Sequence, residues 1–106
     1  MAALTSALAA RDVEAAAAAF ESLRGQALEA RALAGFCDLM ARNRRNALAW
    51  EAFELGREAH GLKALIESGL FLNALLYACC REASMLENAM AVWALMSEAA
   101  VKPERE

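Results

Sequence analysis

The chain has 106 residues, of which 59% are hydrophobic and 24% charged, and its formal net charge at pH 7 is −3. This length suits one modest core, so we expect a single domain over residues 1–106. The negative charge disfavours DNA and anionic membranes as partners. No stretch reaches the roughly 18 uninterrupted apolar residues of a membrane-spanning helix, so we expect a soluble protein.

Apolar residues recur at helical spacing along most of the chain, whereas the signals of β-strands are nearly missing. Alanine, the strongest helix former, is abundant, and the only proline is Pro103. These features predict an all-α fold. In chain order, the spacing predicts helices near residues 13–23, 33–40, 47–58, 70–81 and 85–99, after a first helix from Leu4 that the start of the chain cuts short. Residues 1–10 lack the basic start and long apolar run of a secretory signal, and we expect none.

Several short signals predict where these helices begin and end. Ser84 and Glu87 have the spacing of a capping box, in which each side chain bonds the other residue's backbone N–H. This predicts the start of the last helix and a tight hairpin with the helix before it. Gly25, Gly61 and Gly69 are predicted to terminate helices.

A repeated pattern relates three of the predicted helices, over residues 12–23, 46–57 and 85–96. In each, a small residue precedes an aromatic residue by four positions, and the period is about 35 to 40 residues. The pairs are Ala16 and Phe20, Ala49 and Phe53, and Ala89 and Trp93. Together with Leu86, Met90 and Met96, the last pair predicts the buried stripe of the final helix. We therefore expect Trp93→Ala to cost about 3–5 kcal/mol of stability.

The segment from Asn73 to Val101-Lys102-Pro103 resembles a complete pentatricopeptide repeat, a two-helix unit that ends in a Val/Ile-Lys-Pro turn. The resemblance divides the chain into approximate repeats over residues 1–27, 28–65 and 66–104. It implies an α-solenoid of stacked antiparallel helical hairpins with five to six helices, an architecture that tetratricopeptide-like arrays share. It also implies a location in the mitochondrion or chloroplast.

The same resemblance suggests how the chain would bind single-stranded RNA. Members of this family read a base with a polar residue near the start of the inner helix and with the last residue of the repeat. The third repeat offers Asn73 and Glu104, while the second offers Ala34 and Leu65, which cannot read a base edge. One readable base is a poor code.

The densest basic cluster contains Arg42, Arg44 and Arg45, in a predicted turn between helices. The simplest interpretation is that these arginines lie in a solvent-exposed turn. The alternative is that they contact RNA phosphates. RNA binding in organellar RNA processing or translation therefore stays open as the second hypothesis.

Residues that could support catalysis are scarce. His60 is the only histidine, and the cysteines Cys37, Cys79 and Cys80 lack metal-ligand spacing. We therefore expect no enzyme, no cofactor and no metal.

The leading hypothesis is a non-catalytic adaptor or structural subunit that docks on a larger protein assembly. An incomplete first hairpin would leave Val13 and Phe20 uncovered, so these two residues are the predicted docking site. A further alternative is that the chain is a fragment of a longer repeat protein.

Overall fold

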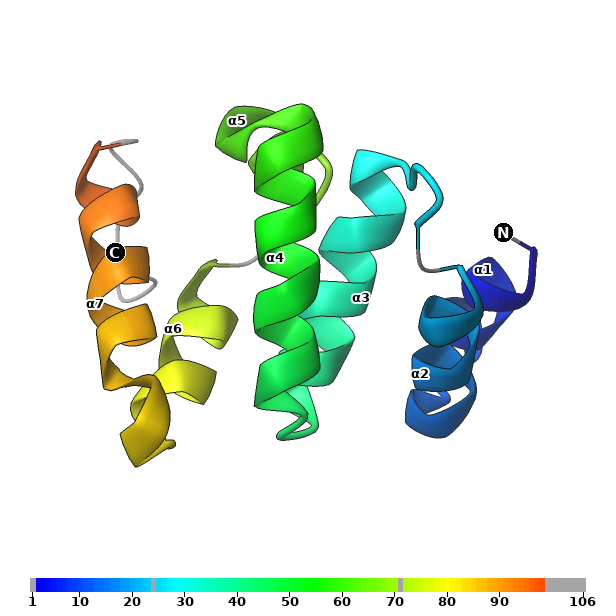
Figure 1. The fold of residues 1–106 in the computed structure, drawn as a ribbon, viewed down its shortest axis with the longest axis horizontal. Helices are drawn as coiled ribbons and strands as arrows, with labels where there is room; N and C mark the ends of the chain where they lie inside the picture. The colour runs from blue at the N-terminus through cyan, green and yellow to red at the C-terminus, as the bar shows by residue number, and fades with distance from the viewer. Residues whose placement is uncertain (1, 24, 71, 99–106) are drawn as a thin grey trace.

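The computed structural model describes residues 2–23, 25–70 and 72–98, which form seven α-helices and a short 3-10 turn (Figure 1). The elements are α1 (Ala2–Ala10), α2 (Val13–Ser22), α3 (Ala30–Arg42), α4 (Asn46–His60), α5 (Leu62–Glu67), α6 (Leu72–Cys80), the 3-10 turn η1 (Ala83–Met85) and α7 (Leu86–Glu98). No strand occurs in these ranges, so the all-α prediction is confirmed for them. The expected number of five to six helices is wrong.

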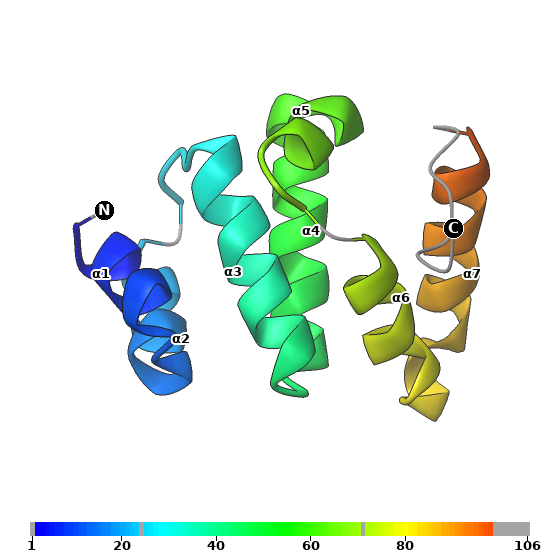
Figure 2. The same cartoon turned by 180° about the vertical axis from the view of Figure 1, so that it is seen from behind.

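Consecutive helices pair into three hairpins, α1 with α2, α3 with α4, and α6 with α7. The hairpins follow one another in chain order along the longest axis of the molecule, with α1 and α2 at one end and α7 at the other (Figures 1 and 2). α3 contacts α1, α2, α4, α5 and α6, and is therefore the centre of the fold.

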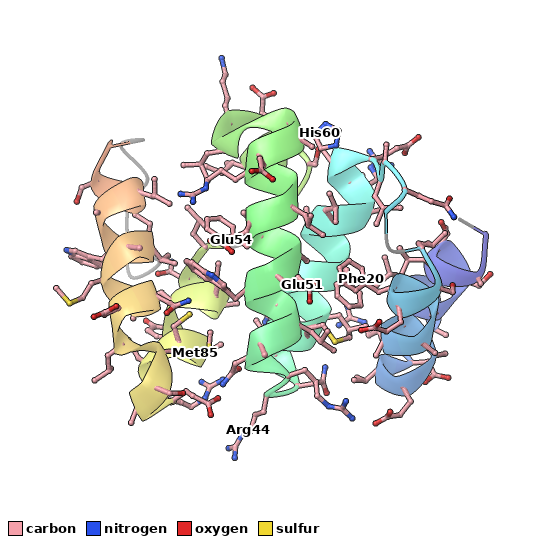
Figure 3. All side chains as sticks on the ribbon, in the orientation of Figure 1. Phe20, Arg44, Glu51, Glu54, His60 and Met85 are labelled. Carbon is pink, nitrogen blue, oxygen red and sulfur yellow. The ribbon has the colours of Figure 1, made fainter. Side chains whose placement is uncertain are left out.

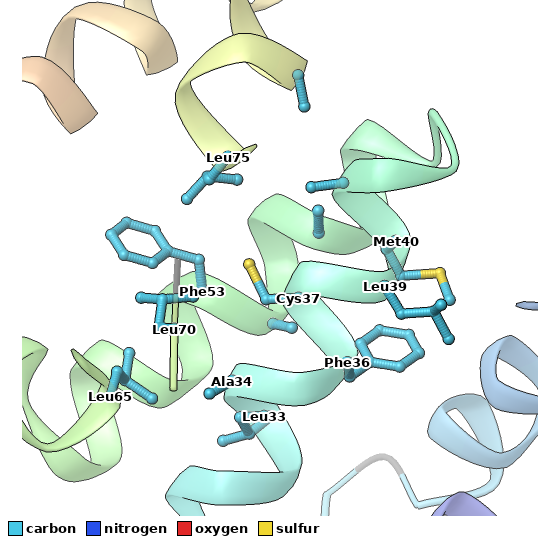
Figure 4. Packing of buried hydrophobic residues seen from close by; sticks show 14 of the residues in the cluster. Leu33, Ala34, Phe36, Cys37, Leu39, Met40, Phe53, Leu65, Leu70 and Leu75 are labelled. Atoms are coloured by element: carbon cyan, nitrogen blue, oxygen red, sulfur yellow. The ribbon is translucent and has the colours of Figure 1, made fainter. Parts of the chain in front are cut away.

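The core is built around α3, because apolar residues occupy most positions of this helix. Figure 4 shows its buried side chains, with Phe53 of α4 and Leu75 of α6 close by. Gly35 and the half-buried Asp38 interrupt this run, and Asp38 lies toward solvent with Arg42. The buried residues of α3 are Ala32, Leu33, Ala34, Phe36, Cys37, Leu39, Met40 and Ala41.

Three helices end close to the glycines that were predicted to terminate them. Gly25, Gly61 and Gly69 all have positive φ values and follow the ends of α2, α4 and α5. Gly61 donates its N–H to the Arg57 carbonyl oxygen at 3.0 Å and also precedes α5, so one residue ends one helix and starts the next. Its φ of 91° is a conformation that glycine adopts without steric cost.

The predicted capping box at Ser84 is not at the start of α7. Ser84 lies inside the 3-10 turn, and the N-cap of that turn is Glu82, in an extended conformation. The Glu82 carboxylate instead accepts a hydrogen bond of 2.7 Å from the Nδ2 amide group of Asn46 in α4. Glu82 therefore ties the third hairpin to the second.

Candidate interaction surface

Val13 and Phe20, the predicted docking residues, lie where a partner has little access to them. α1 forms a full helix that packs on α2, and its Leu4 is completely buried. Phe20 is only 2% exposed and stacks on Phe36 of α3, with ring centroids 4.3 Å apart. Val13 is half-buried against the core. The sequence-based assignment of this site is therefore corrected: the first hairpin is closed by its own helix.

The predicted base-contact residue Asn73 faces the protein interior. It lies near the start of α6 and is 5% exposed, so its amide is not presented to a base. Ala34 and Leu65, the corresponding positions of the second repeat, are also buried. Glu104 lies outside the described residues. The structure thus places the one readable position of this code in the core.

Two of the three clustered arginines bind carboxylates of the protein itself. The Arg42 Nε–H donates to both carboxylate oxygens of Asp38 at 2.8 and 2.9 Å. Arg45 forms an ion pair with Glu14 of α2, which joins the first hairpin to the second. Such exposed pairs add little stability, and a phosphate would compete with these two carboxylates for the guanidinium groups.

Arg44 occupies the left-handed position of the turn between α3 and α4, with φ of 63° (Figure 3). The Arg45 N–H bonds the Met40 carbonyl oxygen at 2.9 Å, and the Arg44 N–H bonds that of Ala41 at 3.4 Å. This is a Schellman cap, whose left-handed position favours glycine. The backbone at Arg44 is therefore strained.

Replacing Arg44 with glycine is expected to raise the free energy of unfolding by about 0.5–1 kcal/mol, because glycine relieves a left-handed cost of about 1–2 kcal/mol and forfeits part of it in chain entropy. Chemical denaturation followed by circular dichroism measures this change. Arg44→Ala removes the same charge but keeps a Cβ atom, so it should give no such gain. Equal stabilisation by both variants would trace the effect to charge instead of backbone strain.

The last helix exposes the residues that its sequence pattern assigned to the core. Trp93 is 54% exposed, Met90 71% and Leu86 52%, while Ala89, Val92 and Met96, on the adjoining face of the helix, are buried. The three exposed residues recur at i, i+4 and i+7, so they form one stripe, here called the exposed face of α7. The expectation that Trp93 is buried, and with it the large cost of Trp93→Ala, is wrong.

The outer side of α4 is acidic and borders a hollow beside α2. Glu51 and Glu54 lie on this side of the helix, as Figure 3 shows, and Glu58 follows one turn later. The hollow has a volume of about 430 Å³. It is lined by Phe20, Leu23, Gly25, Gln26, Ala27, Leu28, Glu51 and Leu55.

His60, Cys37 and Cys79 are held in contacts within the protein. The Nε2–H of His60 donates to the carbonyl oxygen of Leu28 at 2.7 Å, which fastens the end of α4 to the segment before α3. Burial raises the pKa of the Cys37 thiol to about 12 and that of Cys79 to about 11, so both thiols stay protonated near neutral pH. Across residues 2–23, 25–70 and 72–98, no three His, Cys, Asp or Glu side chains are grouped to hold a metal ion.

No match to this chain is found among protein-family models, curated proteins or solved structures. The resemblance to pentatricopeptide repeats therefore rests on the sequence pattern alone. Within the described part of the chain, no helix has the length and apolarity required to cross a membrane.

Proposed function

We propose that this chain is a non-catalytic adaptor or structural subunit, a short stack of helical hairpins that docks on a larger, organellar protein assembly. The observation that carries this proposal is the exposed face of α7. The adjoining face of the same helix packs on the core through Ala89, Val92 and Met96. A helix that is apolar around most of its circumference is typical of a helix that is covered over more than one face.

The exposed face of α7 has the composition of a protein-binding surface. It combines Trp93 with Met90, and tryptophan is frequent among the residues that dominate binding energies. Covering a large apolar side chain stabilises a complex by about 1.5–3 kcal/mol relative to leaving it in water. Three such residues supply at most about 5–9 kcal/mol, which lies within the entropic cost of association of about 4–15 kcal/mol, so the stripe would be the centre of a larger contact.

Binding of single-stranded RNA is the second candidate function, and one surface favours it. Arg42, Tyr77 and Arg81 line a hollow of about 300 Å³ between α3 and α6. Tyr77 is 54% exposed, and an exposed ring beside guanidinium groups can stack on a base while the cations contact phosphate. Three observations disfavour RNA binding: Arg42 pairs with Asp38, Asn73 is buried, and the net charge is −3.

The two functions separate when the full chain is used as bait in an extract of its native source, with and without nuclease. The adaptor proposal expects a nuclease-resistant protein that is retained by the unaltered chain and by Tyr77→Glu, but lost with Trp93→Glu. The RNA alternative expects the reverse dependence: nuclease releases the bound material, Tyr77→Glu abolishes retention and Trp93→Glu leaves it unchanged. That second pattern would overturn the adaptor proposal.

A further inference from the structure

We propose that the groove between α2 and α4 binds a basic segment of a partner protein, which places one large apolar side chain in the hollow beside α2 and lysine or arginine side chains along α4. This surface is distinct from the exposed face of α7, so this partner goes beyond the proposed function. It gives the chain a second docking surface, and an adaptor needs two in order to join two proteins.

The apolar part of the groove is the hollow of about 430 Å³ beside α2. The buried side chains of Phe20 and Leu28 line it, together with that of Leu55, which is 42% exposed. Its volume lies within the range of about 300–1,000 Å³ that is typical of ligand pockets. Because burial of apolar surface is favourable, this hollow suits an apolar side chain of the partner.

One wall of the hollow, the loop between α2 and α3, is held in place by hydrogen bonds within the chain. The Gln26 N–H donates to the Leu23 carbonyl oxygen at 3.0 Å. The Nε2–H of His60 donates to the Leu28 carbonyl oxygen at 2.7 Å and ties the loop to the end of α4. A wall that is already ordered loses little conformational entropy when a partner binds.

The charge beside the hollow selects a basic partner. Glu51, Glu54 and Glu58 lie at i, i+3 and i+7 on α4 and so share one side of the helix, as Figure 3 shows for the first two. All three line a second hollow, of about 350 Å³. Arg57 lines it too, and its guanidinium lies over the Phe53 ring, 5.3 Å from the ring centroid. Three carboxylates beside one guanidinium form an acidic surface, which complements basic side chains.

The two hollows adjoin, because Glu51 and Leu55 line both of them. Glu51 and Glu58 are about 10 Å apart along the helix axis at 1.5 Å per residue, which exceeds the screening length of about 8 Å. A single ammonium group therefore cannot pair with both ends of this row of carboxylates. The occupant must carry several cations beside its apolar group, which a polypeptide segment does and a small amine does not.

Fluorescence anisotropy of labelled peptides titrated with the full chain tests this proposal. The probe is a lysine-rich peptide with one central phenylalanine. It should bind with a dissociation constant on the order of 100 µM, as expected of a small, transient contact. A peptide with serine in place of the phenylalanine should bind about tenfold more weakly, and a peptide with glutamate in place of the lysines should not bind. Raising the salt from about 0.05 to 0.5 M should weaken the probe by at least about tenfold.

Variants of the chain locate the contact. Glu54→Lys and Glu58→Lys should each weaken binding of the probe by about fivefold. Glu87→Lys is the matched control, since it makes the same change of charge at an exposed position of α7, at the other end of the molecule from α2, and should leave binding unchanged (Figure 1). Leu55→Ser should abolish the advantage of the phenylalanine peptide over the serine peptide, with unchanged circular dichroism.

Four results would overturn the proposal. They are no binding of the probe at about 1 mM, equal binding of the phenylalanine and serine peptides, equal losses with Glu54→Lys, Glu58→Lys and Glu87→Lys, and displacement of the probe by an equal concentration of hexylamine, which would indicate a small-molecule site. Trp93→Glu should bind the probe normally. Failure of the groove is therefore distinguishable from failure of the exposed face of α7.

Discussion

Phe36→Ala is expected to lower the free energy of unfolding by about 3–5 kcal/mol, the range for removing a fully buried phenylalanine. Phe36 lies on the central helix α3 and is completely buried. Its ring stacks on that of Phe20 with an interplanar angle of 14°, so it joins the first hairpin to the second. A domain of this size has about 5–15 kcal/mol in total, and this change would therefore remove a large part of it.

Denaturant unfolding of both variants at equal concentration measures this cost against that of Trp93→Ala. Trp93 is 54% exposed, so its replacement should cost less than about 1 kcal/mol. Phe20→Ala should be costly too, and combined with Phe36→Ala it should cost less than the sum of the two single changes, because both remove one stacked contact. A Trp93→Ala cost that matched Phe36→Ala would contradict the orientation of α7.

The all-α fold and most helix positions could be predicted because they depend on local signals. The core stripe of α3 follows from apolar residues at helical spacing, and the turns after α4 and α5 follow from Gly61 and Gly69. Each signal acts within one or two turns of helix. The two missed features, a full α1 and the short helix α5, lack such signals: five of the nine residues of α1 are alanine, which weakens its apolar stripe, and α5 has only six residues.

The orientation of α7 could not be predicted from spacing, because the helix is apolar nearly all round. Leu86, Met90 and Trp93 fit the helical period as well as the buried set of Ala89, Val92 and Met96 does. In the structure Ala89, Val92 and Met96 are buried, and α7 contacts α6. The long uncharged run after Glu87 is the sequence signal that apolar residues of this helix extend beyond its buried face.

The predicted site residues depended on contacts that a sequence does not display. Arg45 pairs with Glu14, which is 31 positions away in the sequence, and Phe20 of α2 stacks on Phe36 of α3. Asn73 was predicted to contact a base because of its position in the repeat. Such a position predicts which helix carries the residue, but not whether its side chain is buried. The residues predicted to bind, Phe20 and Asn73, are buried, whereas the candidate surface on α7 is exposed.

Gly56→Leu is expected to destabilise the fold by about 3 kcal/mol, at the upper end of the usual cost of overpacking. Gly56 is buried on α4, where a Cβ atom would lie 2.7 Å from Cδ2 of Leu65 on α5. Leu65 is 1% exposed, so its methyl groups have little space into which to move. The glycine thus forms a notch that seats the short helix α5 against α4.

The matched alanine variants separate this notch from the general effect of glycine in helices, where alanine is favoured by about 1 kcal/mol. Gly35→Ala should stabilise the protein, because its Cβ would meet the nearest atom, Cδ1 of Leu8, at an ordinary 3.5 Å. Gly56→Ala should destabilise it, since the clash with Leu65 outweighs the gain in propensity. In a Leu65→Ala background that clash is gone, and Gly56→Ala should become favourable. Denaturant unfolding of the four chains in this cycle measures the coupling, and an unchanged effect of Gly56→Ala in the two backgrounds would show that Leu65 does not fill the notch.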